Sequence, residues 1–187
     1  MTRPSVVIIG AGYAGTALAA KLQGQADIIV IEKNDFQDHA VAGLRAYAKG
    51  SIDGAADNAI FSLADALPYA TILQDTVTKV EAESISLSSG VVLSGYDYLV
   101  IATGSHHAIR VQSTTHAEAQ VEYETIRTKL LECKNALIVG GGPVAVEMAG
   151  ELGHAMPELA LTLATSGKTL LDTVSHLPST RSQPQLM

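Results

Sequence analysis

The stretch VVIIGAGYAGTALAAKLQGQADIIVIE, residues 6–32, decides the fold. It opens with an apolar, β-branched run, which is typical of a strand buried on both faces of a parallel sheet. A glycine-rich turn follows, and residues 16–23 then predict a helix that stops at Gly24. Residues 27–32 predict a second buried strand, which ends in Glu32. This order of strand, turn, helix and strand predicts a Rossmann-like unit.

The glycine turn of this unit has the spacing G-x-G-x-x-G. Gly10 allows the tight turn, Gly12 lets a pyrophosphate approach the backbone, and Gly15 lets the helix pack closely on the strand. Glu32 lies 22 residues after Gly10, where its carboxylate can accept hydrogen bonds from both hydroxyls of an adenosine ribose. The combination indicates dinucleotide binding. The alternative is a glycine-rich turn beside a surface glutamate.

Residues 136–164 repeat the same order about 130 residues further along the chain. The second turn reads Gly140-x-Gly142-x-x-Ala145, and alanine in the third place only slightly widens the contact between helix and strand. Thr165 stands where the ribose acid would be expected. A neutral residue does not repel a 2′-phosphate, so this unit gives no reason to prefer NADH over NADPH.

The interval between the two units predicts short strands. We expect a small antiparallel meander of four runs, at residues 72–73, 76–80, 84–87 and 91–93. Residues 98–102 predict a further buried strand.

Two helices are expected outside the repeated units, at residues 40–49 and 117–132. Thr115 and Glu118 fit a capping box at the start of the second helix. Residues 51–67 give a weak signal, which predicts a loop with a short helix.

Composition excludes several classes of protein. Of the 187 residues, 47% are hydrophobic and 17% are charged, which suits a packed α/β core rather than a disordered chain. The net charge of -7, without a basic stripe, argues against a nucleic-acid partner. Apolar runs are too short to span a bilayer, and the N-terminus leaves no room for a signal peptide. The six histidines show no metal-ligand spacing, so we expect no metal site.

A single cysteine, Cys133, cannot form an intrachain disulfide. A reducing compartment is therefore the default expectation, and we expect a cytoplasmic protein. Mitochondrial placement or peripheral membrane contact stays open.

The order of motifs resembles a known family. The first turn and Glu32 are followed by HAVAGLR (39–45), YDYLVIATGS (96–105) and VGGGP (139–143) with Glu147. This order is similar to that of the pyridine nucleotide-disulfide oxidoreductase-like flavoproteins, which have two dinucleotide domains. Within them it is most similar to the apoptosis-inducing-factor-like and ferroptosis-suppressor-like group, near the type II NADH dehydrogenases. The resemblance covers residues 5 to about 172.

The resemblance implies an α/β fold: a Rossmann-like FAD-binding domain with a small meander, joined to an incomplete second Rossmann unit. We expect the N-terminal part of the FAD domain over residues 1–110 and the start of an NAD(P)H-binding domain over residues 111–172. Residues 173–187 do not resemble the family and are expected to form a divergent, disordered tail. Family members continue for roughly the same length again, so the chain looks truncated.

The resemblance also implies cofactor contacts by position. The FAD pyrophosphate would lie on the first turn, with its ribose on Glu32. Lys33 follows Glu32 in the sequence and is a candidate to border the adenosine, the alternative being a solvated side chain. Val77 would lie beside the adenine, and Arg45 near the flavin side of the site. The residues at the end of the strand predicted from residue 98 would lie alongside the FAD. The second turn would face the NAD(P)H pyrophosphate. The remaining residues implied by position are Gly10, Ala11, Gly12, Ala14 and Gly15 of the first turn, Ala102, Thr103 and Gly104 of that strand end, and Gly140, Gly142 and Ala145 of the second turn.

The activity implied is that of an FAD-dependent NAD(P)H oxidoreductase. Hydride would pass from nicotinamide C4 to flavin N5, and electrons would then pass to a quinone or another small-molecule acceptor. Glu147, the candidate catalytic residue, would point toward the contact between nicotinamide and flavin. No Cys-x4-Cys follows the first helix, so a dithiol-relay reductase is disfavoured. Two alternatives stay open: a truncated, non-catalytic nucleotide-binding or interaction protein, and a nicotinamide-only dehydrogenase. The oligomeric state is left open.

Overall fold

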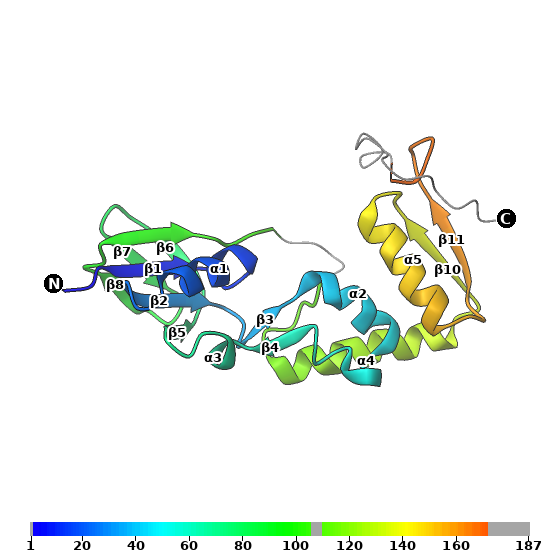
Figure 1. Ribbon diagram of the computed structural model, residues 1–187, viewed down its shortest axis with the longest axis horizontal. Helices are drawn as coiled ribbons and strands as arrows, with labels where there is room; N and C mark the ends of the chain where they lie inside the picture. Colours follow the sequence, from blue (N-terminus) through cyan, green and yellow to red (C-terminus); the bar gives the residue numbers. More distant parts are fainter. Residues whose placement is uncertain (1, 106–109, 172–187) are drawn as a thin grey trace.

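The computed structural model describes residues 2–105 and 110–171, which form three parts along one long axis (Figure 1). A parallel sheet and a small antiparallel sheet lie at one end, helices with a short strand pair lie in the middle, and a β–α–β unit lies at the other end. The strands are β1 (Ser5–Ile9), β2 (Asp27–Glu32), β3 (Phe36–Asp38), β4 (Ile60–Ser62), β5 (Thr71–Gln74), β6 (Val77–Val80), β7 (Ser84–Leu87), β8 (Val92–Ser94), β9 (Tyr98–Ile101), β10 (Asn135–Val139) and β11 (Ala160–Ala164). The helices are α1 (Tyr13–Leu22), α2 (Ala40–Lys49), the 3₁₀ turn η1 (Ile52–Gly54), α3 (Leu63–Ala66), α4 (His116–Glu132) and α5 (Pro143–Ala155).

β1 lies inside a four-stranded parallel sheet with the order β5–β2–β1–β9. Its side chains alternate between two cores, as the strand period requires. Val6 and Ile8 pack with α1, whereas Val7 and Ile9 pack with the antiparallel sheet. All four are at most 6% exposed. β1 is therefore buried on both faces, as its unbroken apolar run predicts.

Two strand predictions were wrong in part. Ile72 and Leu73 belong to β5, which pairs in parallel with β2 and does not join the meander. The antiparallel sheet consequently has three strands, β6–β7–β8. β9 is an edge strand of the described sheet rather than a buried one, because Tyr98 and Ile101 are 62% and 64% exposed. A short apolar run does not specify which sheet it joins or what covers it.

The middle part contains more structure than the sequence predicts. β3 and β4 form an antiparallel pair in which Phe36 lies opposite Ser62. No strand was expected at β3, and β4 lies within residues 51–67, where only a loop with a short helix was expected. The helix at residues 40–49 is confirmed as α2. The capped helix is confirmed as α4, since Thr115 Oγ1 accepts a hydrogen bond from the backbone N–H of Glu118 at 3.3 Å.

The second β–α–β unit pairs β10 with β11 in parallel, with Ala136 opposite Leu161. Met148 and Leu152, which are four residues apart on α5, are both buried. Leu137 and Val139 of β10 are instead 63% and 80% exposed. The α/β fold class, with a parallel sheet, an antiparallel meander and a second β–α–β unit, is confirmed.

One hydrophobic core joins the middle part to the second unit. Phe36, Leu44 and Tyr47 pack in the same cluster as Tyr123 of α4 and Leu152 of α5. The division at residue 110 stays a prediction, and the expected tail from residue 173 lies outside the described residues. Of the described helices, none is long and apolar enough to cross a membrane.

Candidate dinucleotide site

The first glycine turn is tied to the strands on either side of β1. The backbone N–H of Gly10 donates to the carbonyl of Ile31 at 2.8 Å. Gly10 has a φ of +100°, and a β-carbon there would lie 2.5 Å from the carbonyl oxygen of Ala102. Only glycine allows this conformation together with this close approach.

The missing side chains of Gly12 and Gly15 face different surroundings. A β-carbon on Gly15 would lie 2.0 Å from the carbonyl oxygen of Gly10, so this glycine lets α1 pack against the turn. A β-carbon on Gly12 would meet no atom within 4 Å. The backbone at the start of α1 is therefore open to a ligand, and its N–H groups suit a phosphate.

Glu32 reaches from the end of β2 across the glycine turn. Its Oε2 accepts the backbone N–H of Ala11 at 2.7 Å, and its Oε1 accepts the backbone N–H of Asn34 at 3.2 Å. Each carboxylate oxygen can accept a further hydrogen bond, so both stay able to bind a ribose hydroxyl. Asn34 Oδ1 is buried and has no hydrogen-bond partner, which leaves an acceptor available beside Glu32.

These groups line a cavity of about 630 Å³ at the carboxyl ends of β1, β2 and β9, the edge where open parallel sheets bind ligands. The structure brings together eight of the predicted site residues here: Ala11, Gly12, Ala14, Glu32, Lys33, Ala102, Thr103 and Gly104. Sequence reasoning missed seven others: Tyr13, Asn34, Phe36, Asp38, Ser105, Arg110 and Val111. Tyr13 lies inside the motif and Asn34 lies two residues after the ribose acid, so these two had a local signal.

An ion pair forms one wall of this cavity. Arg110 Nη2 lies 2.6 Å from Asp38 Oδ2, and the Asp38 side chain is only 8% exposed. The two residues are 72 positions apart, so nothing in the local sequence indicates the pair.

Arg110 and Asp38 also line a neighbouring apolar pocket of about 360 Å³. Its wall includes Tyr47 and Tyr123, whose rings lie 4.8 Å apart edge to face, and burial raises the pKa of both hydroxyls. Glu147 reaches the same pocket from α5. The pocket therefore lies between the first glycine turn and the second unit.

Tyr13, which lines the main cavity, forms a polar pair with His39. The Tyr13 hydroxyl is hydrogen-bonded to His39 Nδ1, and the two rings meet edge to face at 5.6 Å. The backbone N–H of Val41 also donates to the Tyr13 hydroxyl at 3.4 Å. The pair connects the start of α1 to the start of α2.

Eight predicted site residues do not line the main cavity: Gly10 and Gly15 of the first turn, Gly140, Gly142 and Ala145 of the second turn, and Arg45, Val77 and Glu147. Arg45 binds Glu151 through both carboxylate oxygens, with its Nη2 2.8 Å from Oε1. Val77 lies in β6 and packs against the core beside the antiparallel sheet. Glu147 lines the apolar pocket instead. The roles proposed for these residues stay predictions.

The second glycine turn is built like the first. The backbone N–H of Gly140 donates to the carbonyl of Ala164 at 2.7 Å, and Gly140 has a φ of +136°. A β-carbon on Gly142 would meet no atom within 4 Å, whereas one on Gly140 would lie 3.5 Å from the β-carbon of Ala145. This turn also presents bare backbone at the start of a helix.

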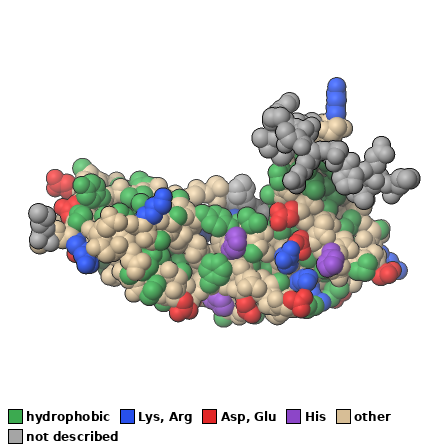
Figure 2. Space-filling view, in the orientation of Figure 1, with side chains coloured by type: hydrophobic (Ala, Val, Ile, Leu, Met, Phe, Trp, Pro, Cys, Tyr) green, Lys and Arg blue, Asp and Glu red, His purple; other side chains and the backbone are tan. Residues whose placement is uncertain are grey.

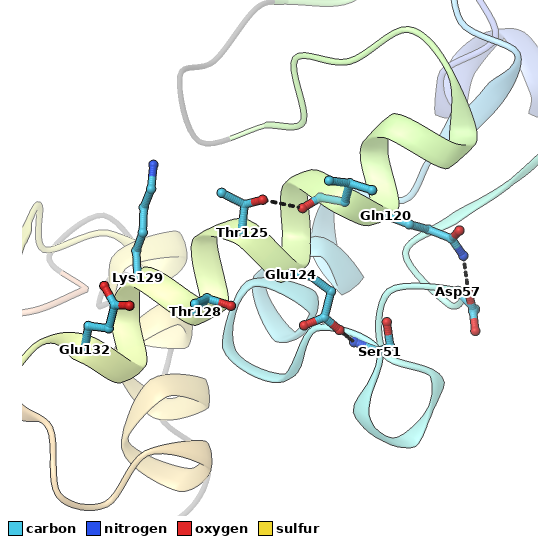
Figure 3. Close-up of a pocket in the computed structure, with 9 residues that line it drawn as sticks. Ser51, Asp57, Gln120, Glu124, Thr125, Thr128, Lys129 and Glu132 are labelled. Atoms are coloured by element: carbon cyan, nitrogen blue, oxygen red, sulfur yellow. Dashed lines mark hydrogen bonds between the residues drawn. The ribbon is translucent and has the colours of Figure 1, made fainter.

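Another groove lies beside α4, and several of its polar groups bind one another (Figure 3). Glu124 accepts the backbone N–H of Ser51 at 2.5 Å, and Gln120 donates to Asp57 at 2.6 Å. The backbone hydrogen bond from Ser51 is the main cause of the lowered pKa of Glu124. These bonds hold the segment after α2 against α4, which is a structural role.

Charges of both signs interleave on the face of α2 and α5 seen in Figure 2. Arg45 of α2 pairs with Glu151 of α5, and Lys49 of α2 pairs with Asp53 at 2.9 Å. Within residues 2–105 and 110–171, no group of three or more histidine, cysteine, aspartate or glutamate side chains is arranged to hold a metal ion.

Comparison with known proteins gives relatives over nearly the whole chain. It is 29% identical over 181 residues to apoptosis-inducing factor homolog A of Dictyostelium discoideum, covering 91% of this chain and 43% of that protein. It is 31% identical over 182 residues to ferroptosis suppressor protein 1 of Xenopus laevis, covering 94% of this chain and 47% of that protein. The chain therefore spans about half the length of these relatives.

A similar fold occurs in the water-forming NADH oxidase from Lactobacillus brevis, with a TM-score of 0.68 at 18% identity. The alignment covers 90% of this chain and 41% of that one. The family model described as pyridine nucleotide-disulphide oxidoreductase matches residues 4–178. The chain accordingly belongs to the pyridine nucleotide-disulphide oxidoreductase family.

Proposed function

We propose that this chain supplies the FAD site and the start of the NAD(P)H site of an FAD-dependent NAD(P)H oxidoreductase, whose electrons pass to a quinone or another small-molecule acceptor. The single observation that carries the proposal is the pair of glycine turns. Each ends a parallel strand, opens a helix and leaves bare backbone amides at its second motif glycine, Gly12 or Gly142. One chain with two such turns suits two dinucleotides.

The residues around the first turn fit FAD. Gly12 leaves room for the pyrophosphate, Glu32 keeps acceptor positions for the ribose, and the buried Asn34 Oδ1 has no protein partner. The adjoining apolar pocket, which shares Asp38 and Arg110 with the cavity, offers room for a flat aromatic ring. When bound, the flavin would supply the two-electron chemistry that the side chains lack.

Glu147 and Val144 support a meeting of the two cofactors at that pocket. Both lie in the first turns of α5, directly after the second glycine turn, and both line the apolar pocket that opens beside Asp38. A nicotinamide whose pyrophosphate rests on Gly142 would therefore lie on the same side as the proposed flavin. Glu147 remains the candidate catalytic residue because it is the acid from the second unit that lines this pocket.

The names of the relatives agree with the proposal. The matching family is one of pyridine nucleotide oxidoreductases, and the Lactobacillus brevis structure of similar fold is bound to NADH. A non-catalytic nucleotide-binding or interaction protein is the second candidate. The exposed apolar face of β10, with Leu137 and Val139, favours it, because a surface of that kind suits association with another chain.

An absorbance spectrum of the purified 187-residue chain tests the proposal. We expect FAD to bind and its absorbance to bleach under anaerobic conditions when NADH or NADPH is added. A colourless protein that FAD does not reconstitute would contradict the proposal and support the non-catalytic candidate. Binding of NADH without flavin, with turnover of an alcohol, would instead support a nicotinamide-only dehydrogenase.

Glu32→Ala tests the ribose contact separately. We expect FAD binding to weaken by about 1–3 kcal/mol, because charged hydrogen bonds to the ribose would be lost. Isothermal titration with FAD measures this, and Glu83→Ala, which removes an exposed acid of the antiparallel sheet's turn, is the matched control. Unchanged FAD affinity in Glu32→Ala would reject the role of Glu32.

A further inference from the structure

The two glycine turns share more than their motif, because each is closed by the same pair of hydrogen bonds. In the first unit, Gly10 N–H binds Ile31 O and Asn34 N–H binds the Glu32 side chain. In the second unit, Gly140 N–H binds Ala164 O, and Gly167 N–H binds Thr165 Oγ1 at 3.1 Å. Thr165 therefore occupies the structural place of Glu32.

Thr165 fills this place with a short, uncharged side chain. A β-carbon on Gly141 would lie 2.4 Å from Thr165 Oγ1, so the hydroxyl lies against the turn, much as the Glu32 carboxylate lies against Ala11. The backbone N–H of Leu171 donates to the carbonyl of Gly141 at 2.7 Å and folds the intervening loop back onto the turn. In the second unit, the expected ribose site therefore lies between the loop of residues 165–171 and the bare backbone of the glycine turn.

The loop from Thr165 to Leu171 contains a cation and no acid. Lys168 is exposed and forms no ion pair with the other described residues. At the first turn, the Glu32 carboxylate would repel a phosphate on the adenosine ribose. At the second turn, a hydroxyl and an ammonium replace that negative charge, and both can donate hydrogen bonds to a phosphate.

We propose that the second turn selects a dinucleotide with a 2′-phosphate, so that NADPH binds in preference to NADH. Thr165 would set this specificity by removing the acid, and Lys168 would supply the charge that faces the phosphate. This inference rests on the proposed function, since it assumes that a dinucleotide binds the second turn.

Direct binding measurements on the 187-residue chain test the proposal without relying on turnover. We expect NADP⁺ to bind about tenfold more tightly than NAD⁺, which corresponds to about 1.4 kcal/mol. Adenosine 2′,5′-bisphosphate should compete with NADP⁺ more strongly than adenosine 5′-monophosphate does. The preference should shrink as salt is raised, because it depends on an exposed charge.

Two variants and a control identify the residues. Lys168→Ala should weaken NADP⁺ binding by about tenfold and leave NAD⁺ binding unchanged, and Thr165→Glu should reverse the preference. Lys134→Ala, which removes an exposed lysine just before β10 at the opposite end of the strand, should change neither affinity.

Equal affinity of the wild-type chain for NADP⁺ and NAD⁺, or an equal loss of both in Lys168→Ala, would overturn the specificity proposal and leave dinucleotide binding intact. Failure of both dinucleotides to bind would instead overturn the proposed NAD(P)H site, and the specificity with it. A melting-temperature measurement on each variant separates lost contacts from lost folding.

Discussion

Gly12 and Gly15 lie three residues apart in one turn, but their missing β-carbons have different consequences. Gly12→Ala places a methyl group in open space, so the free energy of unfolding should fall by less than about 1 kcal/mol, the range of an N-cap change. FAD affinity should fall strongly, because the methyl group enters the space proposed for the pyrophosphate. Thermal melting with and without FAD measures both effects.

Gly15→Ala is the comparison for that prediction. Its new methyl group would overlap the carbonyl oxygen of Gly10, so the protein without cofactor should lose about 1–3 kcal/mol of stability. If Gly12→Ala destabilised the cofactor-free protein as much as Gly15→Ala, the space over Gly12 would not be open. If it left FAD affinity unchanged, the pyrophosphate would not lie there.

Residues inside a motif could be predicted, whereas residues that meet only through the fold could not. The first turn and Glu32 follow a fixed spacing, and the structure gathers most of them at one cavity. Asp38 and Arg110 are 72 positions apart, and their ion pair depends on how β3 lies against the connection before α4. Arg45 lies in a predicted segment, but its guanidinium binds a carboxylate on α5, which the local sequence does not indicate.

Among the elements, the antiparallel sheet is joined to the parallel one by a turn that Asp75 organises. Its carboxylate accepts the Ser88 hydroxyl and the backbone N–H of Thr76 at 2.6 Å and of Ser89 at 3.4 Å. Chiefly because of the Ser88 hydrogen bond, the pKa of Asp75 is lowered to about 2. The folded pKa is below the unfolded one, so the stabilisation is present above pH 3.8 and is lost as the pH falls to about 2.

Asp75→Asn should therefore lower the melting temperature at pH 7, and the difference from the wild type should disappear between pH 4 and pH 2. Melting curves of both proteins across this range measure it. Glu83→Gln, at an exposed acid in the same part of the chain, controls for the loss of a charge. A difference that stays constant down to pH 2 would show that the Asp75 carboxylate does not stabilise the turn.

An ion pair lies at the surface where α2 contacts α5. Arg45 and Glu151 form a bidentate contact, and the Arg45 hydrogen bond is the main cause of the lowered pKa of Glu151. The Arg45 side chain is 62% exposed, so solvent screening should keep the coupling weak. A double-mutant cycle of Arg45→Met and Glu151→Gln in urea measures the coupling, and a coupling as strong as that of a buried ion pair would contradict this description.

Whether a segment forms a helix or a strand could be predicted from the sequence where its hydrophobic pattern or caps extended over enough residues. β1, β2, α2, α4 and α5 had clear periodicity or caps, and each is present. β3 and β4 have three residues each, too few to show an alternation. β5 had a visible apolar run, but it pairs with β2, whose residues lie 42 positions earlier in the chain. Such distant pairing is a property of the whole sheet.

On the scale of the whole molecule, a single core joins α2, α4 and α5. Leu152 is 3% exposed and lies in the same cluster as Leu44, Tyr47 and Tyr123. Because these side chains come from segments far apart in the chain, removing one of them should destabilise both the middle part and the second unit. A substitution on the outer face of β10 should not do so, since Leu137 is 63% exposed.

Leu152→Ala should lower the free energy of unfolding by about 2–4 kcal/mol, the usual effect of a cavity left by a buried leucine. Leu137→Ala, the same chemical change on an exposed strand, should cost less than about 1 kcal/mol. Urea unfolding measures the free energy of unfolding of each variant. Hydrogen exchange of the folded variants shows which amides lose protection. In Leu152→Ala, amides of α2 and of α5 should lose protection together, because both helices pack on the cavity. Loss of protection confined to α5 and the strands β10 and β11 would mean that the second unit unfolds independently, and that the shared core does not couple it to α2.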